Sequence, residues 1–330
     1  MPLVSQAVRY HYRLYGLLVE TNRGFSGLTP VHNASQPDIT IQLVERHALS
    51  EDFPNLRRGS WNQLALLSYL RLTSAGFSLF TDKAQIDQPL IGLRVPAGAE
   101  FVYTRDARRI WATWGQFISS EFAFSLLLNV GMAFNLRLRG LVCLHASGVV
   151  VNGGAVLFLG ASGKGKSTLA SLFGLHGHPI LTDDIAAIRH DADHIWVSPG
   201  YPALRLYPES LPVSDVARRV SPIAPDWDKL FLHLDVSDFH FAQHPAPLSR
   251  IYVLADRDDQ PLIESLSVLK ALPLLVENNY LAPVSQHQDY QHDFAVLAEV
   301  AKRVPVRGLV VPNGIDKLPR LYDIVMSDLT

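Results

Sequence analysis

Eight consecutive residues, 160–167, have the pattern of a phosphate-binding loop. They are Gly-Ala-Ser-Gly-Lys-Gly-Lys-Ser and satisfy G-x-x-x-x-G-K-[ST]. In such a loop, backbone N–H groups and the N-terminus of the following helix surround the phosphates. Lys166 would bridge the β- and γ-phosphate oxygens, and the Ser167 hydroxyl would bind Mg²⁺. The residues predicted to contact the nucleotide are Gly160, Ala161, Ser162, Gly163, Lys164, Gly165, Lys166, Ser167 and Thr168.

The residues on both sides of this loop supply the context that the pattern requires. A β-type apolar run, 155–159, precedes the loop, and residues 167–173 follow it with the apolar spacing of a helix. A phosphate-binding loop joins a strand to a helix in this order, because the helix N-terminus provides partial positive charge. The sequence therefore favours a nucleotide site over a glycine-rich turn without a ligand.

Two adjacent acids follow a second short apolar run. Residues 180–184 are Ile-Leu-Thr-Asp-Asp, so Asp183 and Asp184 stand at the end of a predicted strand. Adjacent residues of an extended strand project to opposite sides, and both can face the phosphates only if the chain turns there. Such a pair could complete a metal site beside the loop. The alternative is a pair that caps a following helix.

A predicted hairpin places a histidine near the same loop. Asn152 and Gly153 separate two β-type runs, which indicates a two-residue type I′ turn. An antiparallel hairpin that turns on these residues puts His145 opposite Gly160, at the mouth of the loop. There a histidine can orient an acceptor or stabilise charge. The alternative is a histidine buried in the sheet and bonded to a backbone carbonyl.

The composition of the whole chain excludes several classes of partner. Its 330 residues are 48% hydrophobic, as in a folded globular protein. The chain has 29 Lys and Arg residues and 31 Asp and Glu residues, so it has no net positive charge that would attract nucleic acid or an anionic membrane. Cys143 is the only cysteine, and the first 21 residues lack the pattern of a secretory signal. We therefore expect a cytoplasmic protein with neither a nucleic-acid nor a membrane partner.

The remaining patterns predict an α/β protein in three segments. Residues 1–110 contain short alternating runs and are predicted to form a smaller, mostly β domain, including one strand over residues 9–19. Residues 111–140 have apolar side chains at helical spacing, which predicts a buried helix that joins the two halves. Residues 141–330 contain the loop and the acids and are predicted to form the catalytic domain.

Three stretches together resemble HPr kinase/phosphorylase. They are His-Ala-Ser-Gly-Val-Val-Val at 145–151, the loop at 160–167, and Gly-His-Pro-Ile-Leu-Thr-Asp-Asp at 177–184. The resemblance implies a P-loop kinase domain of the HPr kinase/phosphoenolpyruvate carboxykinase-like type. Within this group, Gly-Tyr-Pro-Ala-Leu-Arg-Leu-Tyr-Pro at 200–208 is more similar to the HPr-kinase-like proteins encoded with ribosomally made peptides, including lasso-peptide kinases.

The resemblance implies a reaction and roles for the candidate residues. It implies ATP and Mg²⁺ as cofactors, and transfer of the γ-phosphoryl group to a serine or threonine of a peptide or protein. Lys166 would bind phosphate, Ser167 would bind the metal, and His145 would belong to the catalytic surroundings. We expect Asp184 to act as the base and Asp183 to support the metal, although the sequence leaves the reverse assignment open.

The chain departs from HPr kinase/phosphorylase at three places. Thr168 stands where the family regulator has a glutamate, and no Glu-Ile-Arg-Gly stretch is present. Arg205 is a candidate for the arginine of that stretch, and Glu209 for its acid. The sequence therefore leaves open both phosphorylase activity and homo-oligomerisation. Two other functions also stay open: an ATP-binding regulator or ATPase without phosphoryl transfer, and a small-molecule kinase of carboxykinase-like fold.

Overall fold

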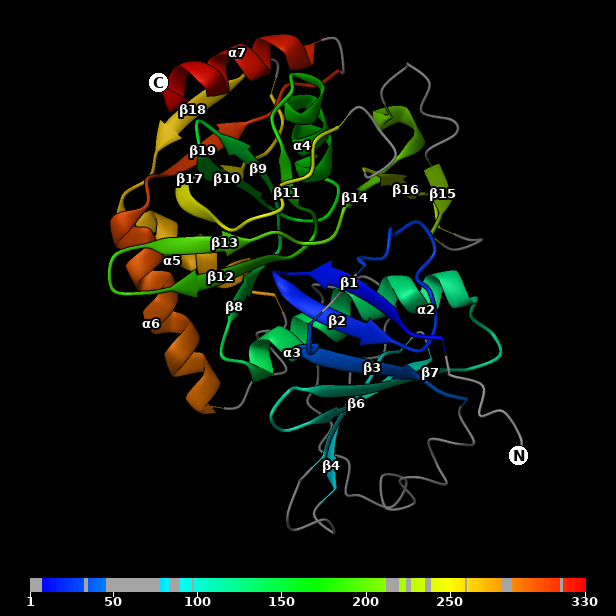
Figure 1. Cartoon of the computed structure of the whole chain (residues 1–330). Helices are drawn as coiled ribbons and strands as arrows, with labels where there is room; N and C mark the ends of the chain where they lie inside the picture. Colours follow the sequence, from blue (N-terminus) through cyan, green and yellow to red (C-terminus); the bar gives the residue numbers. More distant parts are fainter. Residues whose placement is uncertain are drawn as a thin grey trace, which may run out of the picture. The chain divides into compact units, whose positions relative to one another are not determined.

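The computed structural model describes residues 8–32, 35–45, 78–82, 90–96, 98–211, 220–223, 227–234, 239–258, 260–280, 287–314 and 317–330. The chain divides into two compact units, Met1–Gly140 and Leu141–Thr330. Both mix strands with helices, and three separate sheets are formed. Figure 1 shows their elements along the chain.

The N-terminal unit is built on a seven-stranded sheet with the order β1-β2-β3-β7-β6-β5-β4. β3 runs parallel to β2 and to β7, and the other neighbours are antiparallel. The strands are β1 (Tyr10–Leu14), β2 (Leu17–Thr21), β3 (Ile39–Leu43), β4 (Ser78–Asp82), β5 (Leu90–Arg94), β6 (Ala99–Thr104) and β7 (Arg109–Trp114).

Two sequence predictions for this unit are wrong. Residues 9–19 do not form one strand, because Tyr15 and Gly16 have φ values of 55° and 77° and turn the chain between β1 and β2. The helix predicted over 111–140 begins only at Ser120. Residues 109–114 instead form β7, because their backbone groups pair with β3 on one side and with β6 on the other.

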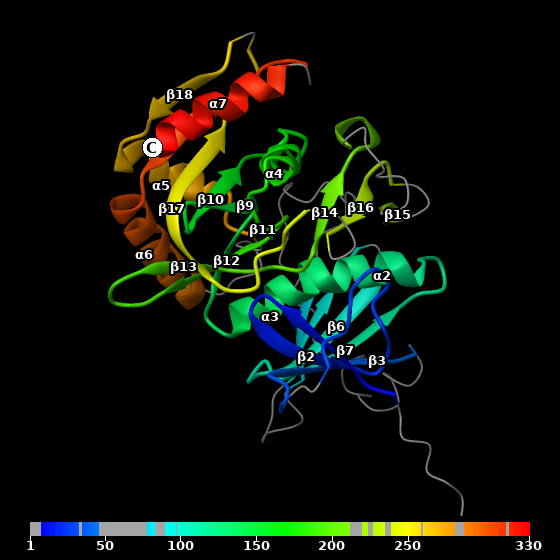
Figure 2. The ribbon, with the colours of Figure 1, turned by 45° about the horizontal axis from the view of Figure 1, so that its top comes forward.

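The predicted buried helix lies against this sheet. It consists of α2 (Ser120–Leu126), a π-helical segment η2 (Leu127–Gly131) and α3 (Met132–Leu138). Tyr15 in the β1–β2 turn and Tyr103 in β6 donate hydrogen bonds to its carbonyls, Tyr15 to Leu128 and Tyr103 to Gly131, both at 3.0 Å. Figure 2 shows the helix across one face of the sheet. The helix therefore belongs to the N-terminal unit, which ends at Gly140.

The C-terminal unit is built on a nine-stranded sheet. Its main path has the order β11-β9-β10-β17-β13-β12-β8, and β19 joins β17 to β18. A separate three-stranded sheet has the order β14-β16-β15. The strands are β8 (Val142–Leu144), β9 (Ala146–Val151), β10 (Gly154–Leu159), β11 (Ile180–Thr182), β12 (Ala186–His190), β13 (Ile195–Ser198), β14 (Ala203–Leu206), β15 (Val220–Pro222), β16 (Leu230–His233), β17 (Ala246–Leu254), β18 (Leu262–Ser265) and β19 (Val306–Val310).

Helices cover both faces of the nine-stranded sheet. α4 (Lys166–Leu175) and α7 (Leu318–Leu329) pack with Val156 and Phe158 of β10 on one face. α5 (Val268–Glu277) and α6 (His287–Arg303) pack with Leu157 and Leu159 on the other. Successive β10 residues enter opposite cores because strand side chains alternate. This burial on both faces makes the centre of the unit a three-layer α/β structure.

Strand direction brings several loops to one edge of this sheet. β10, β17 and β19 are parallel, and β9 is antiparallel to both β10 and β11. The C-terminal ends of β10, β11, β17 and β19 therefore lie at the same edge, where ligands bind in open α/β sheets. Four loops meet there, one after each of these strands.

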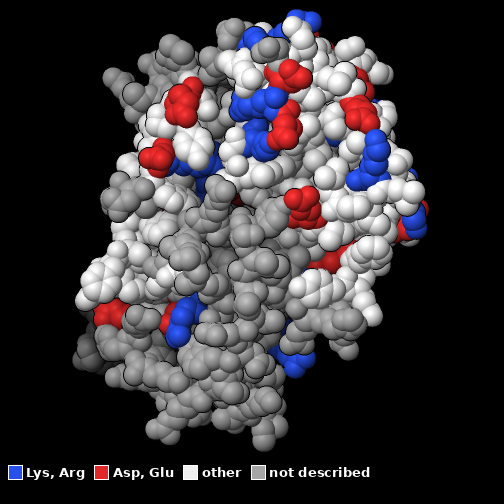
Figure 3. All heavy atoms as spheres, turned by 180° about the vertical axis from the view of Figure 1, so that it is seen from behind, with Lys and Arg blue, Asp and Glu red and all other residues white. Residues whose placement is uncertain are grey.

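In the described ranges, no helix combines the length and apolar character needed to cross a membrane. On the face shown in Figure 3, Lys and Arg side chains are interspersed with Asp and Glu side chains.

Candidate active site

The phosphate-loop sequence adopts the predicted strand, loop and helix. β10 ends at Leu159 and α4 begins at Lys166. Gly160 has a φ of 145°, and a Cβ there would lie 3.2 Å from the Cβ of Leu254. Gly165 has a φ of 103° directly before the helix. Both positions need glycine because L residues with side chains rarely adopt these conformations.

Lys166 lies at the centre of the loop. Its Nζ donates hydrogen bonds to the carbonyl oxygens of Gly160 at 2.7 Å and Ala161 at 3.2 Å. The residue is buried, and burial lowers the pKa of its ammonium group to about 8. The loop backbone therefore holds a positive charge at the N-terminus of α4, where an anion would bind.

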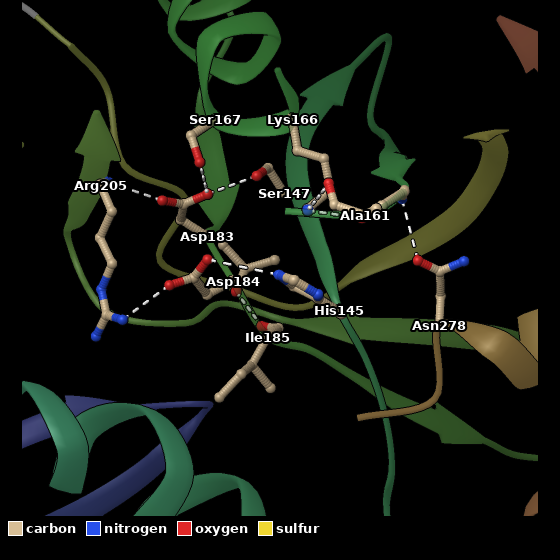
Figure 4. A network of polar contacts seen from close by, with 12 residues as sticks. His145, Ser147, Ala161, Lys166, Ser167, Asp183, Asp184, Ile185, Arg205 and Asn278 are labelled. Atoms are coloured by element: carbon tan, nitrogen blue, oxygen red, sulfur yellow. Dashed lines mark hydrogen bonds and ion pairs between the residues drawn. The ribbon is translucent and has the colours of Figure 1, made fainter. Parts of the chain in front are cut away.

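The two acids stand on a sharp turn after β11. Asp184 has a φ of 63°, and the N–H of Ile185 donates to the carbonyl of Asp183 at 2.8 Å. This three-residue closure is a γ-turn, a strained conformation for a residue other than glycine. Both carboxylates can face the phosphate loop only because the chain turns here. Figure 4 shows Asp183 and Asp184 on the same side as Lys166 and Ser167 of the loop.

Asp183 is buried directly beside the first turn of α4. Its Oδ1 accepts hydrogen bonds from Ser167 Oγ at 2.9 Å and from Ser147 Oγ, and its Oδ2 accepts from the Arg205 N–H at 2.8 Å. Burial and the charge of Asp184 raise its pKa, while the bonds from Ser147 and Arg205 act in the opposite direction. Asp183 therefore links the loop, β9 and β14.

Asp184 faces the cavity and is held by two basic groups. Its Oδ2 lies 2.9 Å from Arg205 Nη1, and its Oδ1 lies 3.8 Å from His145 Nε2. Burial raises the pKa of this carboxyl, but the Arg205 charge and the His145 contact outweigh burial and hold the pKa well below its usual range. Asp184 is therefore an ionised carboxylate in a fixed orientation.

His145 reaches Asp184 from a break in the predicted hairpin. Asn152 and Gly153 have φ values of 50° and 79°, as in a type I′ turn, and β9 pairs with β10 in the predicted register. His145 follows β8 immediately before β9, and its N–H donates to the carbonyl of Asn278 at 2.8 Å. Burial lowers the pKa of its imidazole, despite Asp184. Its side chain points towards Asp184 in Figure 4.

A cavity of about 390 Å³ is lined by His145, Lys166, Ser167 and Asp184, whereas Asp183 is not part of its lining. Four of its cations are Lys166, Arg205, Lys229 and Arg257, and its two acids are Asp184 and Glu209. This excess of positive charge suits a polyphosphate. The cavity is lined by His145, Ser162, Gly163, Gly165, Lys166, Ser167, Thr168, Leu169, Asp184, Arg205, Leu206, Tyr207, Glu209, Ser210, Lys229, Arg257, Val311, Gly314 and Leu318.

Three loop residues predicted to contact the nucleotide are not among this lining. Gly160 and Ala161 instead present their carbonyl oxygens to Lys166. Lys164 pairs with the fully exposed Asp256. The difference arises because the loop curls around Lys166, which turns some of its residues away from the cavity.

Four residues near the site have no local sequence pattern that identifies them. Lys229 precedes β16 and lies over the Tyr207 ring, 5.2 Å from its centroid. Arg257 follows β17, and Ser147 lies in β9. Asn278 follows α5 and accepts a hydrogen bond from the Gly160 N–H at 3.1 Å through its side chain. All four come from segments that only the fold brings to the loop.

The donor set of the site fits Mg²⁺ bound together with phosphates. The Ser167 hydroxyl and the Asp183 carboxylate already contact one another, and both are oxygen ligands. Mg²⁺ is bound by one or two protein oxygens together with phosphates and water. Across the described ranges, no cluster of three His, Cys, Asp or Glu residues offers a complete protein cage for a metal.

Gly200 holds the acid turn by close packing, and replacing it should disturb the site. Its N–H donates to Leu181, and a Cβ would lie 2.5 Å from Thr182 Oγ1 and 3.3 Å from Thr182 Cα. Thr182 Oγ1 in turn donates to the carbonyl of Ile185. We expect Gly200→Ala to lower the free energy of unfolding by about 1–3 kcal/mol, measured by urea denaturation.

The matched control is Gly308→Ala in β19, where the nearest atom to a Cβ lies at 3.8 Å. This variant should unfold at the wild-type urea concentration. A Gly200→Ala protein as stable as the wild type would show that Thr182 can move away from the new Cβ without a loss of stability.

The solved structures that resemble this chain include a weak likeness to a kinase/phosphatase. No protein-family model matches this chain, and no curated protein matches it either. One similar solved structure is the HPr(Ser) kinase/phosphatase from Coxiella burnetii, which shares 14% sequence identity. The match covers 56% of this chain and 94% of that chain, with a TM-score of 0.31. The function proposed below therefore rests on the geometry of the site.

Proposed function

We propose that this chain is an ATP- and Mg²⁺-dependent kinase that phosphorylates a serine or threonine hydroxyl of a peptide or protein. One observation carries the proposal. The half-buried Asp184 carboxylate, which lies 2.9 Å from Arg205 Nη1, lines the same cavity as Lys166 and Ser167 of the phosphate loop. A carboxylate held beside the phosphate loop can orient a hydroxyl and accept its proton, which the binding of a nucleotide alone does not require.

In the proposed reaction, the acceptor oxygen forms a bond to the γ-phosphorus, and the bond from that phosphorus to the β,γ-bridging oxygen breaks. ADP leaves, and the acceptor proton passes to Asp184. The transition state is loose, so Asp184 mainly orients the hydroxyl. Lys166 stabilises the charge that develops on the phosphate oxygens. Asp184 is thus assigned as the base, and Asp183 as the metal-side acid.

Arg205 and His145 position that base. Both contact the Asp184 carboxylate, and Arg205 also donates its backbone N–H to Asp183. They leave the carboxylate little freedom to rotate away from an acceptor. A magnesium ion held by Ser167 and Asp183 would supply charge neutralisation on the phosphate oxygens.

The acceptor would approach from the side of β14 and β16. Tyr207, Glu209 and Lys229 line that part of the cavity, and they offer an aromatic ring with both signs of charge. These groups suit a polypeptide segment better than a small-molecule acceptor. The finer proposal, a ribosomally made precursor peptide of the lasso type, follows from the sequence resemblance.

The test is mass spectrometry of peptides after incubation with the protein and Mg²⁺-ATP. Peptides that contain serine or threonine should gain one phosphate, and their alanine-substituted forms should not. Hydrolysis of ATP at the same rate with and without peptides would favour the regulator or ATPase instead. Phosphorylation of small hydroxylated metabolites alone would favour a small-molecule kinase.

Removal of Arg205 should change the pH dependence of transfer. In the wild type Arg205 keeps the pKa of Asp184 below its usual range, so Asp184 stays ionised as the pH falls. In Arg205→Gln, burial is no longer opposed by this cation, and the pKa of Asp184 should rise. The acid limb of kcat/KM should therefore move to higher pH, measured between about pH 5 and pH 9.

The exposed Arg189 provides the control, since Arg189→Gln alters an arginine on β12 outside the cavity. Its profile should overlay the wild-type profile. An unchanged acid limb in Arg205→Gln would show that Arg205 does not control the pKa of Asp184.

A further inference from the structure

The cavity continues past the phosphate loop on the side away from the acids. Asp184 lies beyond β11, at one end of the strand sequence β11-β9-β10-β17-β19. The cavity also includes Arg257 after β17, and Val311, Gly314 and Leu318 after β19. A nucleotide whose γ-phosphate faces Asp184 therefore extends across the loop towards these residues.

Arg257 stands between the loop and the chain that follows β19. Its Nη2 lies 3.6 Å from the position of a Cβ on Gly165, and its Nη1 donates to the carbonyl of Pro312 at 3.3 Å. A bridge between Asp258 and Pro312 joins the two loops beside it. Its planar guanidinium is thus held next to the phosphate loop without blocking it.

Apolar side chains complete this end of the cavity. Val311 is buried and packs with the core around α4 and α7, and Leu318 is half-buried at the start of α7. Apolar side chains beside a guanidinium suit an aromatic ring, because arginine stacks on ring faces. Phosphate needs no such surface.

We propose that the nucleoside of the bound triphosphate lies between the Arg257 guanidinium and the apolar side chains of Val311 and Leu318. This site rests on the proposed nucleotide binding and extends it to the base. Stacking recognises the ring face that all bases share. The site would therefore accept adenine and guanine nucleotides with similar affinity.

The test compares ATP and GTP with inorganic tripolyphosphate, which has no nucleoside. Equilibrium dissociation constants are measured by calorimetry with Mg²⁺ and without any acceptor. Arg257→Ala should weaken the binding of both nucleotides about tenfold more than it weakens the binding of tripolyphosphate. Arg257→Lys keeps the charge but loses the plane, so it should also lose nucleotide affinity. Arg189→Ala is the matched control.

Three results would overturn the proposal. Equal weakening of nucleotides and tripolyphosphate would make Arg257 a phosphate ligand, and unchanged binding of all three would place the nucleoside elsewhere. Full nucleotide affinity in Arg257→Lys would exclude stacking. Failure of phosphoryl transfer leaves these constants unaffected, whereas a wild-type protein that binds no triphosphate would end both this proposal and the proposed function.

Discussion

Asp184→Asn is expected to lower the rate of phosphoryl transfer about 10³-fold while nucleotide affinity changes by less than about threefold. Asparagine keeps the shape of aspartate but cannot take the acceptor proton, and it loses the ion pair with Arg205. The residues that hold phosphate, Lys166 and the loop backbone, are unchanged. Transfer is measured by phosphopeptide formation and affinity by calorimetry.

The matched control for this prediction is Asp193→Asn, which alters an exposed acid between β12 and β13. That protein should transfer phosphate at the wild-type rate. If Asp184→Asn also retained the wild-type rate, Asp184 would not be the base. A collapse of nucleotide affinity in Asp184→Asn would instead assign the residue to nucleotide or metal binding.

Lys166→Ala is expected to weaken nucleotide binding by at least about 100-fold, with loss of transfer. Its ammonium is buried inside the loop, where a charge interacts with phosphate more strongly than at the surface. Alanine leaves the backbone N–H groups in place but removes this charge. Titration with ATP and Mg²⁺ measures the loss directly.

Lys164 offers a control within the same loop. It pairs with the exposed Asp256 and lies outside the cavity lining, so Lys164→Ala should bind ATP within about threefold of the wild type. Equal losses in the two variants would mean that net loop charge, and not the position of Lys166, determines affinity.

The loop and the hairpin could be predicted because their requirements are local. Glycine at 160 and 165 allows backbone conformations that other residues rarely adopt, and Asn152-Gly153 specifies one tight turn. The hairpin register then determines which residue faces Gly160. The turn at Asp184 could not be predicted from the sequence, because no glycine or proline marks it.

The opposite side of the cavity could not be predicted. Lys229 precedes β16, and Arg257 follows β17. The positions of these strands in their sheets depend on pairing between segments that are far apart in the sequence. Asn278 follows α5, a helix that the sequence does not indicate, since Pro273 stands inside it. The carbonyl that Pro273 leaves without a donor belongs to Leu269, a strongly exposed residue, where water can replace the lost bond.

The helix predicted at residues 111–114, which form part of β7, is wrong for a similar reason. Trp111 and Trp114 are three residues apart, which fits a helix, but Ile110 and Ala112 are two apart and both buried, which fits a strand. Such short apolar runs fit both periods. Here the pairing of β7 with β3 on one side and β6 on the other decides the outcome, and β3 is far from β7 in the sequence.

In the proposed reaction, the γ-phosphoryl group of a nucleotide passes to a hydroxyl oriented by Asp184. The most direct measurement follows the label of γ-³²P-ATP in the presence of Mg²⁺ and serine- and threonine-containing peptides. We predict that the label moves to peptide hydroxyl groups in the wild type and stays in ATP with Asp184→Asn. Release of the label only as inorganic phosphate, at a rate that peptides and the Asp184→Asn substitution leave unchanged, would contradict it.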